Sequence, residues 1–170
     1  MPGRNEQEAW RAFTRPVEQT VGCVDLSARL IERSFRDTGI WLLSSTGPGV
    51  RLTSSLRLVF TFQLVPVEVD GQWRMTTRKY DYSIVKGRTA ELVFGWHWHP
   101  RSRRSPITYP HLHVPSASMY PTRHIPTGRV SIEDVIAFAI RELGAVPTDD
   151  GAMGRLQANA EVHRQFRSWG

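Results

Sequence analysis

The sequence contains very little cysteine and lysine. Cys23 is the only cysteine among 170 residues, so the chain has neither an internal disulfide nor a Cys-Cys metal site. A lone cysteine is most often a small buried hydrophobe, and we expect that role for Cys23. Lysine occurs only at Lys79 and Lys86, and arginine supplies the remaining basic residues. A GC-rich genome is one explanation of this skew.

Long apolar runs and the familiar catalytic motifs are also missing. No stretch approaches the roughly 18 apolar residues of a transmembrane helix, and the polar N-terminus lacks the apolar run of a signal peptide. We therefore expect a cytoplasmic protein with no membrane partner. The sequence has no Walker loop, Gly-x-Gly-x-x-Gly, Gly-x-Ser-x-Gly, His-Glu-x-x-His or Cys-x-x-Cys motif. These absences argue against nucleotide-dependent and serine-hydrolase chemistry.

The chain does have enough apolar content for one core, and it carries a surplus of positive charge. Hydrophobic residues make up 40% of the sequence, which predicts a single domain over 1–170, with 1–20 and 149–170 as accessory helical ends. The formal net charge of +6 favours association with phosphate backbones or with an acidic partner.

The middle of the chain predicts an antiparallel meander. Asp70-Gly71 is a strong signal for a two-residue hairpin, and Lys86-Gly87-Arg88 predicts a second turn. A proline within a strand pattern predicts a break, here at Pro66. The expected strands are 56–69, 73–85, 91–99 and 111–114.

The clearest predicted helix follows the sheet. Ser131 is a suitable N-cap, Asp134 completes a variant capping box, and Gly144 is a suitable stop. The apolar stripe between them indicates an amphipathic helix packed on one face of the sheet. Weaker patterns predict a helix at 6–13 that Pro16 would interrupt, helical spacing over 27–36 and a strand at 40–43. The expected fold class is therefore α+β.

Two His-x-His motifs stand out, His97/His99 and His111/His113. Side chains two apart on a strand share a face, so each pair points to one side. The alternating residues form an apolar face at the opposite side, and Gly95 leaves open space beside the imidazoles. We expect the four imidazoles to converge on the face away from the helix. The apolar residues expected opposite them are Leu92, Phe94, Trp96, Trp98, Leu112 and Val114.

Three interpretations of the histidines remain open. They are solvated surface residues, or ligands of zinc or another divalent metal, or a metal-independent acid and base. A metal site would need its supporting carboxylate from elsewhere, such as Asp81. For acid–base chemistry RNA is a suitable substrate, because its 2′-hydroxyl supplies the nucleophile.

The neighbours of the histidines slightly favour the third interpretation. Arg101, Arg103 and Arg104 follow the first pair, and an arginine fork matches a phosphate, although a solvated loop is the alternative. Tyr80 shares a face of the preceding strand with Tyr82.

The strand register decides which neighbours accompany the histidines. The turn at 86–88 would place Tyr80 opposite Phe94 and Asp81 opposite Val93. A one-residue shift would exchange the faces, so either set can accompany the histidines. Tyr109 and His124 are weaker candidates, and His163 is expected on the surface.

Four segments resemble a class of small prokaryotic proteins that includes TumE-type toxins. The segments are YDYSIV, ELVFGWHWHP, YPHLHV and HIPTGRVSIEDVIAFAIRELG. The resemblance covers about 73–144, under half of the chain. It implies a growth-inhibiting toxin with an antitoxin or helix-turn-helix regulator as partner, acting on RNA.

The favoured hypothesis is a toxin-like component of a toxin–antitoxin pair that cleaves RNA without a metal cofactor. His97, His99, His111, His113 and Tyr80 are the expected catalytic residues, and Arg101, Arg103 and Arg104 are expected to bind the substrate. The alternatives are a histidine-ligated metalloenzyme and a non-catalytic module that binds nucleic acid or a regulator.

Overall fold

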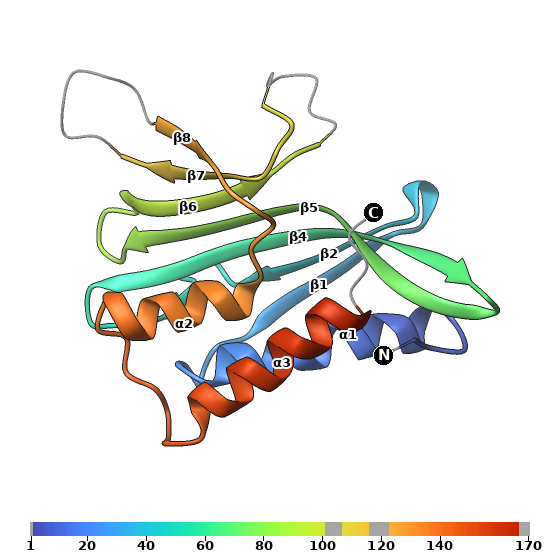
Figure 1. Cartoon of the computed structure of the whole chain (residues 1–170), viewed down its shortest axis with the longest axis horizontal. Coiled ribbons are helices and arrows are strands. Elements are labelled where there is room, and N and C mark those ends of the chain that lie inside the picture. The colour runs from blue at the N-terminus through green and yellow to red at the C-terminus, as the bar shows by residue number, and fades with distance from the viewer. Residues whose placement is uncertain (1, 101–106, 116–122, 167–170) are drawn as a thin grey trace.

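A computed structural model describes residues 2–100, 107–115 and 123–166. Within them the chain forms an eight-stranded sheet and three α-helices (Figure 1). All strand pairs are antiparallel in the order β1-β2-β4-β5-β6-β7-β8, and β3 pairs with β4. The expected α+β fold with a meander sheet is confirmed. The strands are β1 (Leu30–Phe35), β2 (Ile40–Ser45), β3 (Val50–Arg51), β4 (Leu56–Val69), β5 (Gln72–Lys86), β6 (Leu92–Trp98), β7 (His111–Val114) and β8 (Arg123–Pro126).

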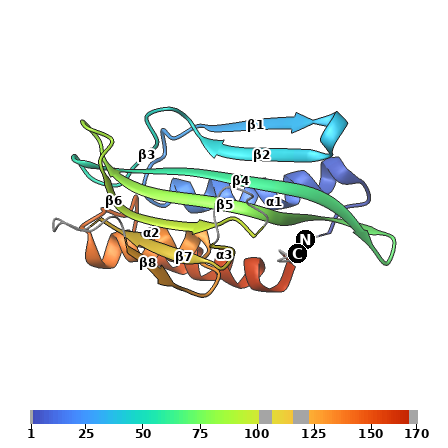
Figure 2. The same ribbon diagram turned by 90° about the horizontal axis from the view of Figure 1, so that it is seen from above.

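The helices gather on one side of the sheet. α1 (Glu6–Gly22) contacts β4 and β5, and α3 (Ala152–Phe166) contacts α1 and α2 (Ile132–Glu142). Figure 2 shows the strands spread from β1 to β8 with the helices behind them. Among the described residues no helix covers the opposite side, which we call the open face. No helix in these ranges has the length and apolar character needed to cross a membrane.

Helix α1 continues through Pro16, so the predicted interruption there is wrong. Asn5 caps the helix, its side chain accepting a hydrogen bond from the Glu8 backbone N–H at 2.9 Å. The apolar residues before and after Pro16, including Phe13 and Val17, are buried. Their burial outweighs the cost of about 3 kcal/mol that an interior proline imposes on a helix.

Helical spacing over 27–36 is the second incorrect expectation. Residues Leu30–Phe35 form β1, which pairs with β2 along its full length. Leu26, just before this segment, is 77% exposed and so does not belong to a buried helical face. Pairing with a neighbouring strand decided this segment, because a few apolar residues cannot distinguish a short strand from a helix.

The hairpin between β4 and β5 has the predicted turn. Asp70 and Gly71 have φ values of 52° and 71°, as a type I′ turn requires at both central residues. Pro66 does not end β4, which continues to Val69 opposite β5.

The helix-covered face of the sheet holds the hydrophobic core. Phe60 and Phe62 of β4 and Tyr80 and Tyr82 of β5 are at most 1% exposed. Phe62 packs edge-on against Phe13 of α1, with ring centroids 5.4 Å apart. This aromatic layer attaches the N-terminal helix to the centre of the sheet.

The C-terminal helices complete this core. Ser131 and Asp134 form the predicted capping box of α2, and Phe138 packs edge-on against Phe94 at 5.3 Å. Cys23 is buried as expected. His163 of α3 is only 2% exposed, so its predicted surface position is wrong. Its helix packs against α1 and α2, which the sparse apolar residues of the tail did not indicate.

The pairing of β5 with β6 decides which residues share the open face. Asp81 lies opposite His97, and Tyr80 lies opposite Trp98. The register differs by four residues from the expected one, because the connection reaches Glu91, whose carbonyl accepts the Lys86 N–H. A shift by an even number preserves the faces. Lys79 and Asp81 therefore accompany the histidines.

A bulge modifies the predicted alternation at the start of β6. The register shifts between Ile84 and Val85, so Leu92 pairs with Val85 while Phe94 pairs with Ile84. Phe94 packs in the core. Leu92 instead lies beside Gly95 on the open face, and its predicted place in the apolar row is wrong. The bulge adds one residue to β6. Leu92, which precedes the bulge, therefore points to the face opposite the expected one.

Candidate metal centre

Strand pairing brings five of the six histidines together on the open face. Asp81 of β5, His97 of β6 and His111 of β7 lie side by side across three strands. In the adjacent row His113 lies between Gly95 of β6 and His124 of β8. Period-two alternation and the registers of three strand pairs together create this cluster. We call His97, His99, His111, His113 and His124 the histidine cluster.

Three of the imidazoles are close enough to share one ion. The ring centroids of His97 and His113 are 4.2 Å apart, and those of His111 and His113 are 4.7 Å apart. One nitrogen from each of His97, His111 and His113 lies within 4.8 Å of the others. This separation leaves little room for anything except an ion or a water molecule between the ligand atoms.

Two of these rings present nitrogen atoms without partners. Nε2 of His97 and Nε2 of His113 are both buried, and neither has a hydrogen-bond partner among the described residues. A buried polar atom that makes no hydrogen bond costs about 1–3 kcal/mol. A metal ion shared by both nitrogens would satisfy them together.

His111 is prepared to act as a ligand by its own hydrogen bond. Its side chain is 4% exposed, and Nδ1 lies 2.9 Å from the Tyr109 carbonyl oxygen. A carbonyl can only accept, so Nδ1 carries the proton and donates it. Neutral His111 therefore has its lone pair on Nε2, the arrangement commonly found in metal-ligating histidines.

Gly95 provides the space in which the rings meet. A Cβ atom at this position would lie 3.0 Å from Nε2 of His97 and 3.5 Å from Cβ of His113. Any side chain larger than hydrogen would displace the nitrogen that we identify as a ligand atom. The open space that the sequence predicted beside the imidazoles is instead filled by the rings themselves and by Leu92.

Asp81 supports the cluster from β5. Its Oδ1 atom lies 2.7 Å from Nε2 of His99 and 3.9 Å from Nδ1 of His97, and its Oδ2 atom lies 3.0 Å from Nζ of Lys79. Burial alone would raise the pKa of Asp81, but the hydrogen bond and charge of His99, together with Lys79, hold that pKa below its usual range. Asp81 is thus a carboxylate that holds His99 by a hydrogen bond and places a negative charge beside His97.

The environment keeps two of the candidate ligands neutral. Burial, followed by the neighbouring imidazoles, lowers the pKa of His113 from 6.5 to about 4. Burial also lowers the pKa of His97, although Asp81 opposes this effect. Neutral imidazole is the form that binds a metal, whereas a general acid must carry a proton. Zinc, copper, nickel and iron(II) all suit such a donor set.

Some predicted site residues lie elsewhere. Tyr80 is fully buried on the helix-covered face, where its hydroxyl accepts the Val130 N–H at 3.1 Å. Strand alternation therefore directs Tyr80 away from the histidines, and the structure does not bring it into the predicted site. Arg101, Arg103 and Arg104 lie outside the described residues.

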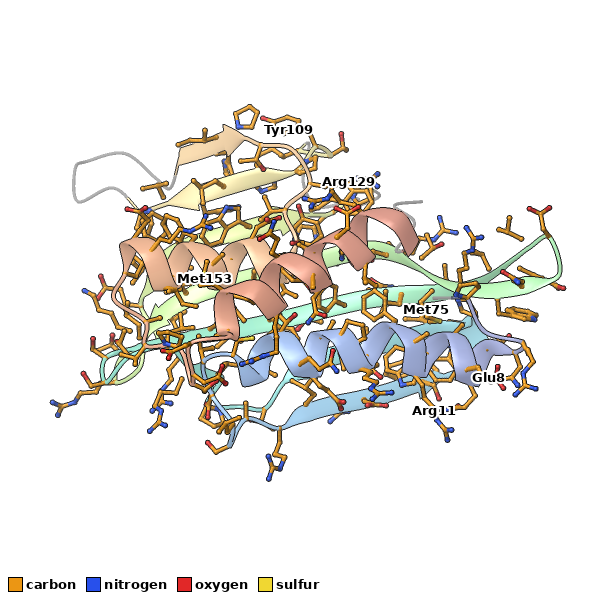
Figure 3. The ribbon with its side chains drawn as sticks, turned by 60° about the horizontal axis from the view of Figure 1, so that its bottom comes forward. Glu8, Arg11, Met75, Tyr109, Arg129 and Met153 are labelled. Atoms are coloured by element: carbon orange, nitrogen blue, oxygen red, sulfur yellow. The ribbon has the colours of Figure 1, made fainter. Side chains whose placement is uncertain are left out.

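His124 is more central than the sequence indicated. It is exposed on β8, and its ring centroid lies 4.4 Å from that of His113. Strand β8 was not predicted, because four residues ending in a proline give little signal. Tyr109 contributes its backbone carbonyl, which no side-chain motif reveals. In Figure 3 Tyr109 lies towards the β7–β8 end of the sheet, far from Glu8 and Arg11 of α1.

Comparison of the chain with protein-family models, curated proteins and solved structures found no match. The resemblance to TumE-type toxins therefore stays a prediction based on short motifs.

Proposed function

We propose that the protein is a metal-dependent enzyme whose centre consists of His97, His111 and His113. The observation that carries this proposal is the pair of buried, unpartnered Nε2 atoms of His97 and His113, among the described residues, in a group that includes His111. Zinc is the ion that we expect, because three imidazoles are a common catalytic zinc ligand set.

An enzymatic role is favoured over a structural one by what surrounds the three ligands. Three protein ligands leave one position of a tetrahedral ion available. The cluster lies on the open face, and His97 and His99 are 21% and 23% exposed. A bound zinc ion would supply a Lewis acid and lower the pKa of coordinated water. His99, hydrogen-bonded to Asp81, is the residue placed to accept or return a proton.

Metal content and thermal stability test this proposal directly. Protein purified without a polyhistidine tag should contain about one equivalent of zinc, and chelation should lower its melting temperature. His97→Ala and His113→Ala should abolish stoichiometric binding. His163→Gln is the matched control, because it removes the one histidine outside the cluster and should leave the stoichiometry unchanged. Full zinc binding by His97→Ala/His113→Ala would exclude this centre.

Metal-independent RNA cleavage is the second candidate, and the hydrogen bond between His99 and Asp81 favours it. That pair, with Lys79 next to it, could move a proton without a metal ion. The lowered pKa values of His97 and His113 count against those two as the general acid. Cleavage of RNA that persists in chelator and is lost in His99→Ala would select this candidate over the metalloenzyme.

The role of toxin, with RNA as target and an antitoxin or helix-turn-helix regulator as partner, stays a prediction. Induced expression in a bacterial host tests it. Growth arrest by the wild-type chain, absent with His113→Ala at equal protein level, would support the toxin role. Unimpaired growth at high expression would argue against it.

A further inference from the structure

A cleft of about 900 Å³ opens next to the histidine cluster, and His99 is part of its wall. The cleft lies where β6 ends at Trp98 while β4 and β5 continue beyond it. Its volume is within the range of small-molecule sites. This cleft is large enough to hold a substrate of nucleotide size beside the candidate metal centre.

Among the described residues that line the cleft, the side chains with a permanent charge are all basic. Arg78, Lys79 and Arg129 contribute to its wall, and no aspartate or glutamate does. Two other clefts in the described ranges differ in charge. One is lined by Glu6 without a basic residue, and the other by two acidic and two basic side chains. The positive cleft is thus the one that adjoins the histidine cluster.

Two of the three cations are held in place by neighbours. Nζ of Lys79 is 3.0 Å from Oδ2 of Asp81, and the other oxygen of this carboxylate contacts His99. The Arg129 guanidinium lies 3.9 Å from the ring centroid of Trp98. Stacking on an aromatic face fixes the plane of a guanidinium. The cations are therefore positioned in advance, which limits the entropy lost on binding.

The cleft adjoins the candidate centre through His99. His99 lines the cleft, and its Nε2 atom is 2.7 Å from Oδ1 of Asp81. One ligand atom from each of Asp81, His97 and His99 lies within 4.8 Å of the others. A group held in the cleft would consequently lie next to His97, one of the proposed metal ligands.

We propose that this cleft binds a phosphate group of the substrate, so that the enzyme acts on a phosphate-containing molecule. The reaction in this proposal rests on the proposed function of the metal centre, whereas phosphate binding itself rests on Arg78, Lys79 and Arg129. A carboxylate group of a substrate carries one negative charge, whereas a phosphate group carries up to two. The three cations of the cleft are therefore more than a carboxylate needs and match a phosphate. Two arginines add the paired donors that fit phosphate oxygens.

Binding measurements with three probes test the proposal and identify the source of the phosphate. Inorganic phosphate, a nucleoside monophosphate and a short single-stranded RNA are titrated separately into chelator-treated and zinc-loaded protein. At least one probe should bind in both states. Tightest binding by the RNA would identify a polynucleotide, and tightest binding by the monophosphate would identify a nucleotide.

Matched variants locate the binding site. Arg78→Gln and Lys79→Gln should each weaken binding about tenfold, since each removes a charge-assisted hydrogen bond. Arg88→Gln removes the same charge from the exposed β5–β6 turn and should change affinity less than twofold. Circular dichroism and melting temperature check that each variant folds. No binding of any probe, or equal weakening in Arg88→Gln, would overturn the proposal.

A further variant separates this proposal from the metal centre. His113→Ala should lose zinc but retain the phosphate affinity of the chelator-treated protein. If neither the wild-type protein nor any variant contains zinc but phosphate still binds, the metalloenzyme alone is refuted. Stoichiometric zinc without binding of any phosphate probe would refute the phosphate site alone.

Discussion

The two faces of the sheet follow the same alternation but have opposite environments. Tyr80, Trp96 and Trp98 face helices and are at most 8% exposed. Asp81 and His97 alternate with these residues along β5 and β6, and His113 of β7 lies with them on the open face. The comparison shows how one antiparallel sheet separates its tasks. One face supplies the apolar burial that stabilises the fold, and the other can hold polar groups whose arrangement costs stability.

The largest expected contrast is between substitutions of large side chains on the two faces. Phe62→Ala should lower the free energy of unfolding by about 3–5 kcal/mol, because the ring is fully buried among aromatic neighbours. His113→Ala in chelator-treated protein should lower it by less than about 1 kcal/mol, because the ring is only half-buried. Denaturant titration of both variants measures the difference. Equal losses would show that both faces contribute equally to stability.

Asp81→Asn should affect the open face alone. The amide keeps the shape of the side chain but loses the negative charge that holds His99 and lies beside His97. We expect zinc affinity to fall by about 10–100-fold. Competition with a chromophoric chelator measures the affinity, and Asp70→Asn in the hairpin turn is the control. Unchanged zinc affinity in Asp81→Asn would show that Asp81 does not support the metal ligands.

Gly95→Ala tests the space between the rings. Its Cβ would displace Nε2 of His97 from 3.0 Å, so we expect zinc affinity to fall by about tenfold. Gly154→Ala is the matched control, because no atom lies within 4 Å of the Cβ position in α3. The same competition assay applies to both. An equal affinity in the two variants would mean that the rings move without affecting the site.

A further effect that we expect is a dependence of stability on pH without metal. The pKa of His113 is about 4 in the folded chain and near 6.5 when unfolded. Between these values the unfolded chain binds more protons, so stability should fall as the pH is lowered from about 6.5 towards 4. Melting temperatures at pH 7.5 and 5.0 in chelator measure this fall. His113→Phe should show a smaller fall, and an equal fall would assign it to other groups.

The sequence predicted the elements whose signals are local. The capping box at Ser131 and Asp134, the Asp70-Gly71 turn and the alternation within β6 depend on neighbours along the chain. At Pro16 and in β1 the tertiary contacts outweighed the local signals, so the helix continued and the segment became a strand. Burial and strand pairing contribute more free energy than intrinsic propensity.

The candidate site divides in the same way. The residue types and the two His-x-His spacings were enough to place His97 and His99 on one face, and His111 and His113 likewise, because strand geometry has a period of two. The sequence could not show that these pairs lie on adjacent strands, that Asp81 rather than Tyr80 stands beside them, or that His124 joins from β8. Those facts depend on the registers of β5 to β8, which are set by connections of variable length and by one bulge. Register is a property of packed strands, so only the tertiary structure brought the imidazoles together.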